Sequence, residues 1–253
     1  MQKDKIIVFT IADQNNEKYA NMLQNSFKKF HPDIDFHIVK GEELATYLKN
    51  DPNFFYRATP VLAEAFLNNG YDLAIKIDAD SIVTGDLSEV FDCKYDVATV
   101  YNWNKVDPKM YGEIGLLTIH PTQYYNCGFV ALRSVKFAKH WKDLCYSYHF
   151  DAMPFREQGF LNVLAYYGSY EIKCMDDGDG WWGLRSKGEW NKCQMVDGKM
   201  VLGKAVDNYP ERDKEIKVVH FAGGSNGLKM NYKAFFNDEC SGYLDNLVNE
   251  KKE

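Results

Sequence analysis

Two carboxylates separated by a single residue are the part of this sequence whose types and spacing most clearly indicate chemistry. Asp78 and Asp80 follow the short apolar run 73–77, which is bounded by glycine-containing turns and is typical of a strand. Residues two apart on a strand point to the same side, so both carboxylates can converge on one point beyond its end. Carboxylate oxygens are ligands that Mg²⁺ and Mn²⁺ prefer. The pattern therefore predicts a divalent-metal site, with an ordinary turn as the alternative because Asp and Ser are common turn residues.

Two further side chains could serve such a site. His220 lies near the end of the apolar stretch 217–224, which is predicted to be a strand. A lone histidine there is usually a core residue, but beside a metal it becomes a candidate third ligand. On a predicted helix over 155–164, Glu157 shares a face with apolar residues three and four positions later, so its carboxylate is expected to turn inward. The helix dipole alone also favours an acid in that first turn.

Other polar and aromatic residues are candidates for holding a ligand, each with a structural alternative. Arg57 could contact a phosphate or ribose, or be an exposed surface residue. Tyr19, on a predicted helix over 17–30, could stack on a base or belong to the core. Trp181 and Trp182 lie in a glycine-rich acidic loop and suit the flat faces of a sugar, although either could be a core residue.

The elements that must position these side chains form an alternating α/β pattern. A strand over 6–10, the helix over 17–30 and a strand over 36–39 predict a parallel βαβ unit. The turn 11–16 follows the first strand, where open α/β sheets bind ligands, but it lacks the glycine pattern of a dinucleotide site. Residues 102–114 are predicted to form a loop over the site. The remaining predicted strands are 95–100, 126–132 and 170–175, and the remaining predicted helices are 60–66, a short helical turn over 86–91, 134–145 and 232–248.

Composition limits the possible partners and compartments. The 253 residues carry a formal net charge of −6 and no long basic run, so nucleic acid is not an expected partner. No apolar segment is long enough to cross a membrane. The six cysteines contain no C-x-x-C pair, which argues against a structural zinc site and for free thiols in a reducing compartment. With neither a signal-peptide pattern nor an N-glycosylation acceptor, a cytoplasmic location is expected.

Taken together and in order, several segments resemble the retaining nucleotide-sugar glycosyltransferases of the glycogenin-like family, glycosyltransferase family 8. The resemblance implies an α/β protein with the GT-A fold, a Rossmann-like arrangement in which helices flank a mixed central sheet. It implies one glycosyltransferase domain over 1–253, with a nucleotide-binding half over about 1–100 and a sugar- and acceptor-binding half over about 101–253. The matching segments are 6–10 with 19–20, 56–57, 77–83 with 86–91, 126–128, 157–162 and 218–223.

The resemblance also implies roles for individual residues. Mn²⁺ or Mg²⁺ would be bound by Asp78, Asp80 and His220 and would bridge the diphosphate of a UDP-sugar. The uracil would be held by Thr10, Ala12, Asp13 and Tyr19. The diphosphate or sugar side would be contacted by Arg57, Asp78, Ala79, Gly223 and Lys229. The transferred sugar would be lined by Asn126, Glu157 and Gln158.

Two departures from the family pattern matter. Glu157 stands where the family usually has Asp, which lengthens the carboxylate arm by one carbon. The family places a diphosphate-binding Lys six residues after the histidine, and here that position is Asn226. Lys229 follows three residues later. Either an insertion returns Lys229 to the phosphate, or that cation is lost.

The predicted function is metal-dependent and retaining transfer of a hexose or pentose from a UDP-sugar to a hydroxyl of a glycan or another acceptor, with Trp181 and Trp182 as candidate acceptor contacts. A divalent ion and placed cations would stabilise the negative charge that develops on the departing UDP. Two enzymatic alternatives share the same site, namely a nucleotide-sugar hydrolase and a nucleotidyltransferase. The lack of a glycine-rich activating loop after the first strand counts against nucleotidyl transfer. A third alternative is a non-catalytic UDP-sugar-binding module.

Overall fold

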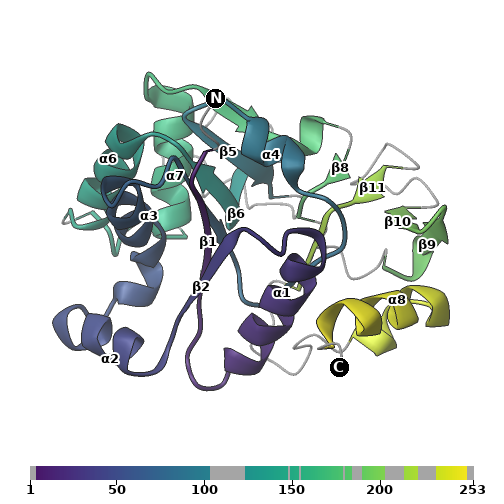
Figure 1. The fold of residues 1–253 in the computed structure, drawn as a ribbon. Helices are drawn as coiled ribbons and strands as arrows, with labels where there is room; N and C mark the ends of the chain where they lie inside the picture. The colour runs from purple at the N-terminus through teal and green to yellow at the C-terminus, as the bar shows by residue number, and fades with distance from the viewer. Residues whose placement is uncertain are drawn as a thin grey trace.

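The structure, a computed structural model, describes residues 4–102, 123–147, 149–153, 155–178, 180–183, 190–202, 214–221 and 232–249. Its centre is a six-stranded sheet with the order β2-β1-β3-β6-β5-β7 (Figure 1). The strands of this sheet are β1 (Ile6–Ile11), β2 (Asp35–Val39), β3 (Leu73–Ile77), β5 (Val97–Tyr101), β6 (Tyr125–Leu132) and β7 (Ile172–Cys174).

The sheet is mixed, as predicted. β1 pairs in parallel with both β2 and β3, whereas β6 runs antiparallel to β3 and β5. β7 is again parallel to β5. The carboxyl end of β3 therefore meets the amino end of β6, which places residues that follow Ile77 beside residues near the start of β6.

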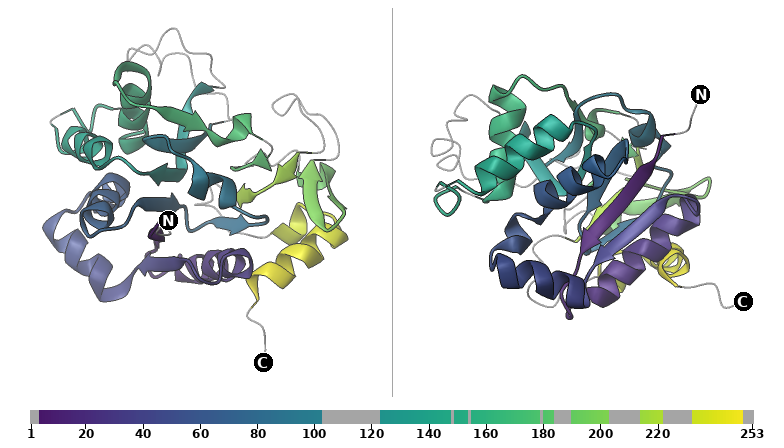
Figure 2. Two further views of the ribbon diagram at one scale, coloured as in Figure 1. Left: turned by 45° about the horizontal axis from the view of Figure 1, so that its top comes forward. Right: turned by 60° about the vertical axis from the view of Figure 1, so that its left-hand side comes forward.

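Helices cover both faces of the central sheet (Figures 1 and 2). Along β1, Ile7 and Phe9 point into one core, and Ile6 and Val8 point into the opposite one, because side chains alternate along a strand. Burial on both faces explains why the strands read as continuous apolar runs. The first core contains residues of α2 (Gly41–Asn50), α3 (Ala58–Asn68), α6 (Val135–Cys145) and α7 (Glu157–Tyr167), and the second contains residues of α1 (Glu17–Phe30) and α4 (Ser88–Asp92).

In a third core, residues from the later part of the chain pack against α1. Ile82, Val219 and Leu244 belong to it, and α1 lies beside the helix α8 (Figure 1). A short antiparallel pair, β4 with β12, links the segment after β3 to this later region. The elements are β4 (Ser81–Val83), β8 (Gly180–Trp181), β9 (Cys193–Val196), β10 (Lys199–Leu202), β11 (Glu215–Ile216), β12 (Val218–His220) and α8 (Asp238–Val248).

Local sequence patterns predicted the bounds of some helices correctly. The helix predicted over 17–30 is confirmed with the same bounds, and Ser134 caps α6 by accepting a hydrogen bond from the N–H of Phe137 at 3.2 Å. The single helix predicted over 232–248 is wrong, because Asn237 caps a new helix by accepting from the Cys240 N–H at 2.8 Å. The helix α2 and the short strands β4 and β8–β11 were not predicted. Apart from Asn102, the predicted loop over 102–114 lies outside the described residues.

No disulfide joins any of the six cysteines, all of which the structure describes, as their spacing predicted. None of the described helices has the length and apolar character that crossing a membrane requires.

Candidate functional site

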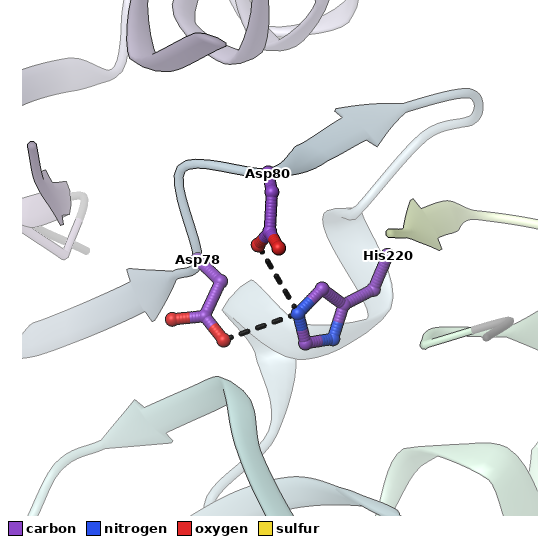
Figure 3. A group of neighbouring side chains, drawn as sticks. All are labelled: Asp78, Asp80 and His220. Atoms are coloured by element: carbon purple, nitrogen blue, oxygen red, sulfur yellow. Dashed lines mark ion pairs between the residues drawn. The ribbon is translucent and has the colours of Figure 1, made fainter. Parts of the chain in front are cut away.

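Asp78, Asp80 and His220 come together at the carboxyl end of β3, as the sequence predicted (Figure 3). The Nε2 atom of His220 lies 3.2 Å from one oxygen of each carboxylate. The imidazole is buried, whereas each aspartate side chain is about one-third exposed. The three side chains therefore form one cluster that is closed on the histidine side and open on the carboxylate side.

Backbone pairing brings these distant residues into register. The strand β12 pairs with β4 so that His220 lies opposite Ser81, immediately after the aspartates. The carbonyl of Asp80 accepts a hydrogen bond from the N–H of Phe221 at 2.9 Å. The N–H of Asp78 donates to the carbonyl of Gly128 at 2.8 Å. Three parts of the chain are thus held together by main-chain contacts before any side chain is considered.

Gly128 allows the close approach that the histidine needs. A Cβ atom at this position would lie 2.3 Å from Cε1 and 2.4 Å from Nδ1 of His220, and 2.6 Å from the side-chain oxygen of Asn126. Those distances are far below van der Waals contact, so any larger residue would displace the imidazole or the strand. Glycine is therefore required here because no larger side chain fits. Its backbone conformation is not the reason, since its φ is not in the left-handed region.

The donor set fits a hard divalent cation. Two carboxylates and one imidazole offer ligand atoms that all lie within 4.8 Å of one another. Neighbouring ligands of an octahedral ion with bonds of about 2.1 Å lie about 3 Å apart, close to the separations between Nε2 and the two carboxylate oxygens. Burial alone would lower the pKa of His220, but the Asp80 and Asp78 carboxylates raise it above its usual range. Residues of this chemistry hold Mg²⁺ or Mn²⁺.

Lys76 is a residue of the site that sequence reasoning missed. It lies within β3 and is buried, and its ammonium group donates to the second oxygen of Asp78 and, at 2.9 Å, to the carbonyl of Cys127. Burial would raise the pKa of Asp78, but Lys76 and His220 hold it well below its usual range. The signal was available, because positions 76, 78 and 80 share the spacing of two that was noticed for the acids alone.

Glu157 turns inward, as its spacing predicted. Together with Lys76, Asp78 and Thr59, it lines a small pocket of about 100 Å³. Its Oε2 atom is buried and has no hydrogen-bond partner among the described residues. Burial raises the pKa of Glu157 to about 8, with Lys76 opposing the rise. This carboxyl group thus shares a pocket with Asp78 and bears a proton more readily than an exposed acid does.

Asn126 and Gln158 hold each other beside this pocket. The amide of Asn126 donates to the side-chain oxygen of Gln158 at 2.7 Å, and Cys127 N–H donates to the same oxygen at 3.1 Å. The side-chain oxygen of Asn126 accepts from Gly128 N–H at 2.7 Å. The structure therefore brings Asn126 on β6 and Gln158 on α7 together, and Asn126 lies beside the glycine against which His220 packs.

Two buried polar contacts position the start of α7. Asn162, which is fully buried, accepts from Tyr125 N–H at 2.7 Å and donates to the Gln158 carbonyl at 2.8 Å. The indole N–H of Trp141 donates to the carbonyl of Glu157 at 2.8 Å. Sequence reasoning did not identify Asn162, because an asparagine in a helix interior gives no local signal of what it will meet.

The residues predicted to hold a base lie at the carboxyl end of β1. Thr10 and Ala12 are buried, and the N–H of Ala12 is used by the Val39 carbonyl at 3.1 Å. Asp13 accepts from the N–H of Asn16 at 3.0 Å ahead of α1. The ring of Tyr19 packs partly against the third core. Their predicted contacts with uracil stay predictions.

Arg57 has a structural role in addition to its predicted one. Its guanidinium pairs with Asp51 at 2.8 Å and donates to the Cys145 carbonyl at 2.9 Å. The same group lies over the rings of Tyr146 and Phe150. Arg57 is therefore not an exposed surface residue, and it ties the start of α3 to the end of α6. Its contact with a phosphate or sugar stays a prediction.

The prediction that Trp182 contacts an acceptor is wrong. Its side chain is fully buried and packs edge-on against Phe129, so it offers no face to a ligand. The side chain of Trp181 and the predicted residues Gly223 and Lys229 lie outside the described residues.

A hollow of about 580 Å³ lies elsewhere in the described part of the chain. It is lined by Ile6 and His31 at the amino end of β1, whereas the carboxylates follow the carboxyl end of the parallel strand β3. His31 there accepts a hydrogen bond from Leu87 N–H at 2.9 Å, and burial lowers its pKa. This hollow is therefore separate from the metal ligands.

Comparison with known proteins bears on the fold. No protein-family model matches the chain, and no curated protein matches it in sequence. Among solved structures, the galactosyltransferase LgtC in complex with donor and acceptor sugar analogues is similar over 98% of both chains, with a TM-score of 0.57 and 17% identity. The bifunctional glycosyltransferase WbbM is similar over 88% of this chain but only 46% of its own, with a TM-score of 0.54 and 16% identity. Mouse xyloside xylosyltransferase 1 is similar over 87% of this chain and 99% of its own, with a TM-score of 0.51 and 10% identity. The central mixed sheet, its flanking helices and these likenesses show that the chain has the GT-A fold of glycosyltransferases.

Proposed function

We propose that the protein is a metal-dependent, retaining glycosyltransferase that moves a hexose or pentose from a UDP-sugar to a hydroxyl of a glycan or another acceptor. The observation that carries the proposal is the convergence of Asp78, Asp80 and His220 at the end of β3 in a GT-A fold. Glu157 and Gln158 next to this cluster support the same reading, since a transferred sugar would have to lie beside its diphosphate.

Different residues would contact the metal ion, the uracil and the diphosphate of the donor. Asp78, Asp80 and His220 would bind Mn²⁺ or Mg²⁺, which when present supplies positive charge to the leaving diphosphate. Lys76 engages one oxygen of Asp78 and leaves the other directed toward His220. Thr10, Ala12, Asp13 and Tyr19 are proposed to hold the uracil. The diphosphate contacts are assigned to Arg57, Ala79, Gly223 and Lys229.

Transfer exchanges one bond of the anomeric carbon for another. The bond to the diphosphate oxygen breaks, the acceptor oxygen bonds to the same carbon, and the acceptor proton passes to the departing phosphate oxygen on the same face. Positive charge develops on the sugar ring during this exchange. Glu157, facing the pocket that Asp78 also lines, is placed to stabilise that charge as a carboxylate, while Asn126 and Gln158 orient the hydroxyl groups.

Calorimetric titration of UDP with and without Mn²⁺ tests the metal site. We expect tight binding to the wild type only with Mn²⁺, and at least tenfold weaker binding to Asp80→Asn, because the variant loses a charged ligand. Asp33→Asn removes a similar charge from an exposed position and should bind as the wild type does. If UDP binds equally well without Mn²⁺ and to Asp80→Asn, the two aspartates are ordinary turn residues.

Product analysis then separates the three reactions that share this site. A glycosylated product that forms only with an acceptor supports transfer. Free sugar at the same rate without an acceptor would indicate hydrolysis, and pyrophosphate release from a nucleoside triphosphate and a sugar phosphate would indicate nucleotidyl transfer. Mn²⁺-dependent UDP binding with no turnover of any donor would indicate a binding module.

A further inference from the structure

A second hollow adjoins the proposed catalytic centre, and Glu157 lines both. It has a volume of about 450 Å³, in the range of ligand pockets, and we call it the acceptor groove. Two of its residues expose large aromatic rings, Tyr56 at 48% and Phe155 at 46%. Single exposed aromatic side chains are common, but two around one hollow offer flat apolar faces to a ring-shaped ligand. The groove is lined by Tyr56, Met153, Phe155, Arg156, Glu157 and Gln158.

Arg156 brings a positive charge to this groove. Its guanidinium lies 3.7 Å from the centre of the Tyr56 ring. Its Nη1 atom is buried and has no hydrogen-bond partner in the part of the chain that the structure describes. The other two arginines of that part, Arg57 and Arg133, both pair with aspartates. A buried donor without an acceptor costs free energy, which an anionic ligand would offset.

The backbone that carries these side chains is strained. Phe155 and Arg156 both have positive φ, 56° and 50°, although neither is glycine. Each such residue costs about 1–3 kcal/mol, and strain of this kind is concentrated at binding and catalytic sites. The strained pair immediately precedes Glu157, so the same turn places Phe155 and Arg156 in the groove and starts the helix that carries the carboxyl group.

Glu157 belongs to both hollows. It lines the small pocket with Lys76 and Asp78, and it also lines the groove with Tyr56 and Arg156. Because the two hollows share this side chain, a molecule held in the groove would lie next to a sugar held beside Asp78.

We propose that the acceptor groove binds a sugar acceptor that carries an anionic group, a phosphate or a carboxylate. The anionic group pairs with Arg156, and the sugar ring packs against Tyr56 and Phe155. This inference rests on the proposed glycosyltransferase function and deepens it by naming the chemical class of the acceptor. It also replaces Trp182, which is buried in the core, as the proposed acceptor contact.

Binding of three probe sugars tests the groove, with and without UDP and Mn²⁺. Saturation-transfer NMR titrations would use glucuronate, glucose 6-phosphate and the neutral methyl glucoside. We expect one or both anionic sugars to bind at least tenfold more tightly than the neutral one, and the preference to shrink as salt is added. Arg156→Gln should abolish the preference and Arg156→Lys should retain part of it. Lys136→Gln removes a cation from an exposed position of α6, where it lies over the Tyr170 ring, and it should leave the preference unchanged.

The outcomes separate this inference from the proposed function. Equal binding of neutral and anionic sugars, or a preference that persists in Arg156→Gln, would overturn the groove assignment while leaving Mn²⁺-dependent UDP binding intact. If Arg156→Gln does not fold, Arg156→Lys decides instead, and it should narrow the preference for the anionic sugars. Binding of UDP-glucuronate and UDP-glucose tests whether Arg156 contacts the donor instead. If Arg156→Gln weakens only the binding of UDP-glucuronate, the guanidinium contacts the donor sugar and the inference is overturned.

Discussion

Glu157 is the residue at which stability and the proposed catalysis are opposed. Its Oε2 atom is buried without a partner, and burial raises the pKa of the carboxyl group to about 8 from its ordinary value of 4.5. Between these values the folded protein holds a proton that the unfolded chain releases. Stability is therefore fully present below about pH 4.5 and is lost as pH rises through about 8.

The variant Glu157→Gln should gain stability at alkaline pH and lose activity. Because glutamine cannot ionise, we expect the variant to exceed the wild type by about 1–3 kcal/mol in unfolding free energy at pH 8.5, the cost typical of an unsatisfied buried group, and by less at pH 5.5. Wild-type transfer should rise with pH through about 8 as the carboxylate forms. Transfer by the variant should be lower by about 100-fold and without this rise.

Urea denaturation at the two pH values, together with a pH–rate profile, checks both parts. Glu239→Gln, an exposed position in the first turn of α8, serves as the control and should show the wild-type pH dependence. Parallel stability profiles for the wild type and Glu157→Gln would mean that Glu157 does not titrate in this range in the folded protein.

At the scale of elements, the start of β6 is the structural support of the site. It supplies Asn126, the carbonyl that receives the Asp78 N–H, and the glycine against which His220 packs. The second support is α7, which Asn162 ties to β6. A strand and a helix that are separated in the chain thus orient the same pocket from two sides.

Gly128→Ala should damage the metal site more than the fold. The added Cβ would meet the His220 ring at 2.3 Å, so we expect UDP–Mn²⁺ binding to weaken at least tenfold. The unfolding free energy should fall by about 1–3 kcal/mol, as is usual for overpacking. Calorimetry and urea denaturation measure the two effects.

Gly242→Ala is the matched control for that substitution. It adds the same methyl group within α8, where nothing lies within 4 Å of the new Cβ. Alanine is the better helix former, so this variant should be as stable as the wild type or up to about 1 kcal/mol more stable. Unchanged UDP–Mn²⁺ binding in both variants would show that His220 does not need its present position.

At the scale of the whole molecule, the site joins two packed regions. Asp78 follows a strand of the central sheet, whereas His220 belongs to β12, whose residues Val218 and Val219 pack into the second and third cores respectively. A ligand that bridges these residues binds only when both regions are folded and in register. Binding should therefore stabilise the protein as a unit.

Thermal unfolding measures this coupling. At UDP and Mn²⁺ concentrations about 100-fold above the dissociation constant, linkage gives about 2.7 kcal/mol of stabilisation. For a chain of this size we expect the melting temperature to rise by about 5–10 °C. The rise should require UDP and Mn²⁺ together and should be smaller by about half or more in Asp80→Asn, because tenfold weaker binding leaves about 1.4 kcal/mol of stabilisation at the same concentrations. An equal rise for that variant would mean that the ligand does not bridge the cluster.

Much of the fold and part of the site could be predicted from the sequence, because their signals are local. The helix over 17–30 follows from the spacing of its apolar residues, and the Asp78–Asp80 pair follows from the period of a strand. The inward turn of Glu157 follows from helical spacing in the same way. The prediction of a mixed sheet, in contrast, came from the family resemblance, since strand order leaves no local mark.

Only the tertiary structure decided which polar side chains meet one another and which are removed from solvent. Lys76 reads as an interruption of an apolar strand, and only packing shows that its ammonium group also donates at 2.9 Å to the carbonyl of the distant residue Cys127. The local sequence around Trp182 and around Arg156 does not indicate where either side chain lies. In the structure, Trp182 is buried in the core and Arg156 lines a hollow. The reason is physical, because periodicity determines the direction in which a side chain points, whereas its partner is supplied by a segment far away in the chain.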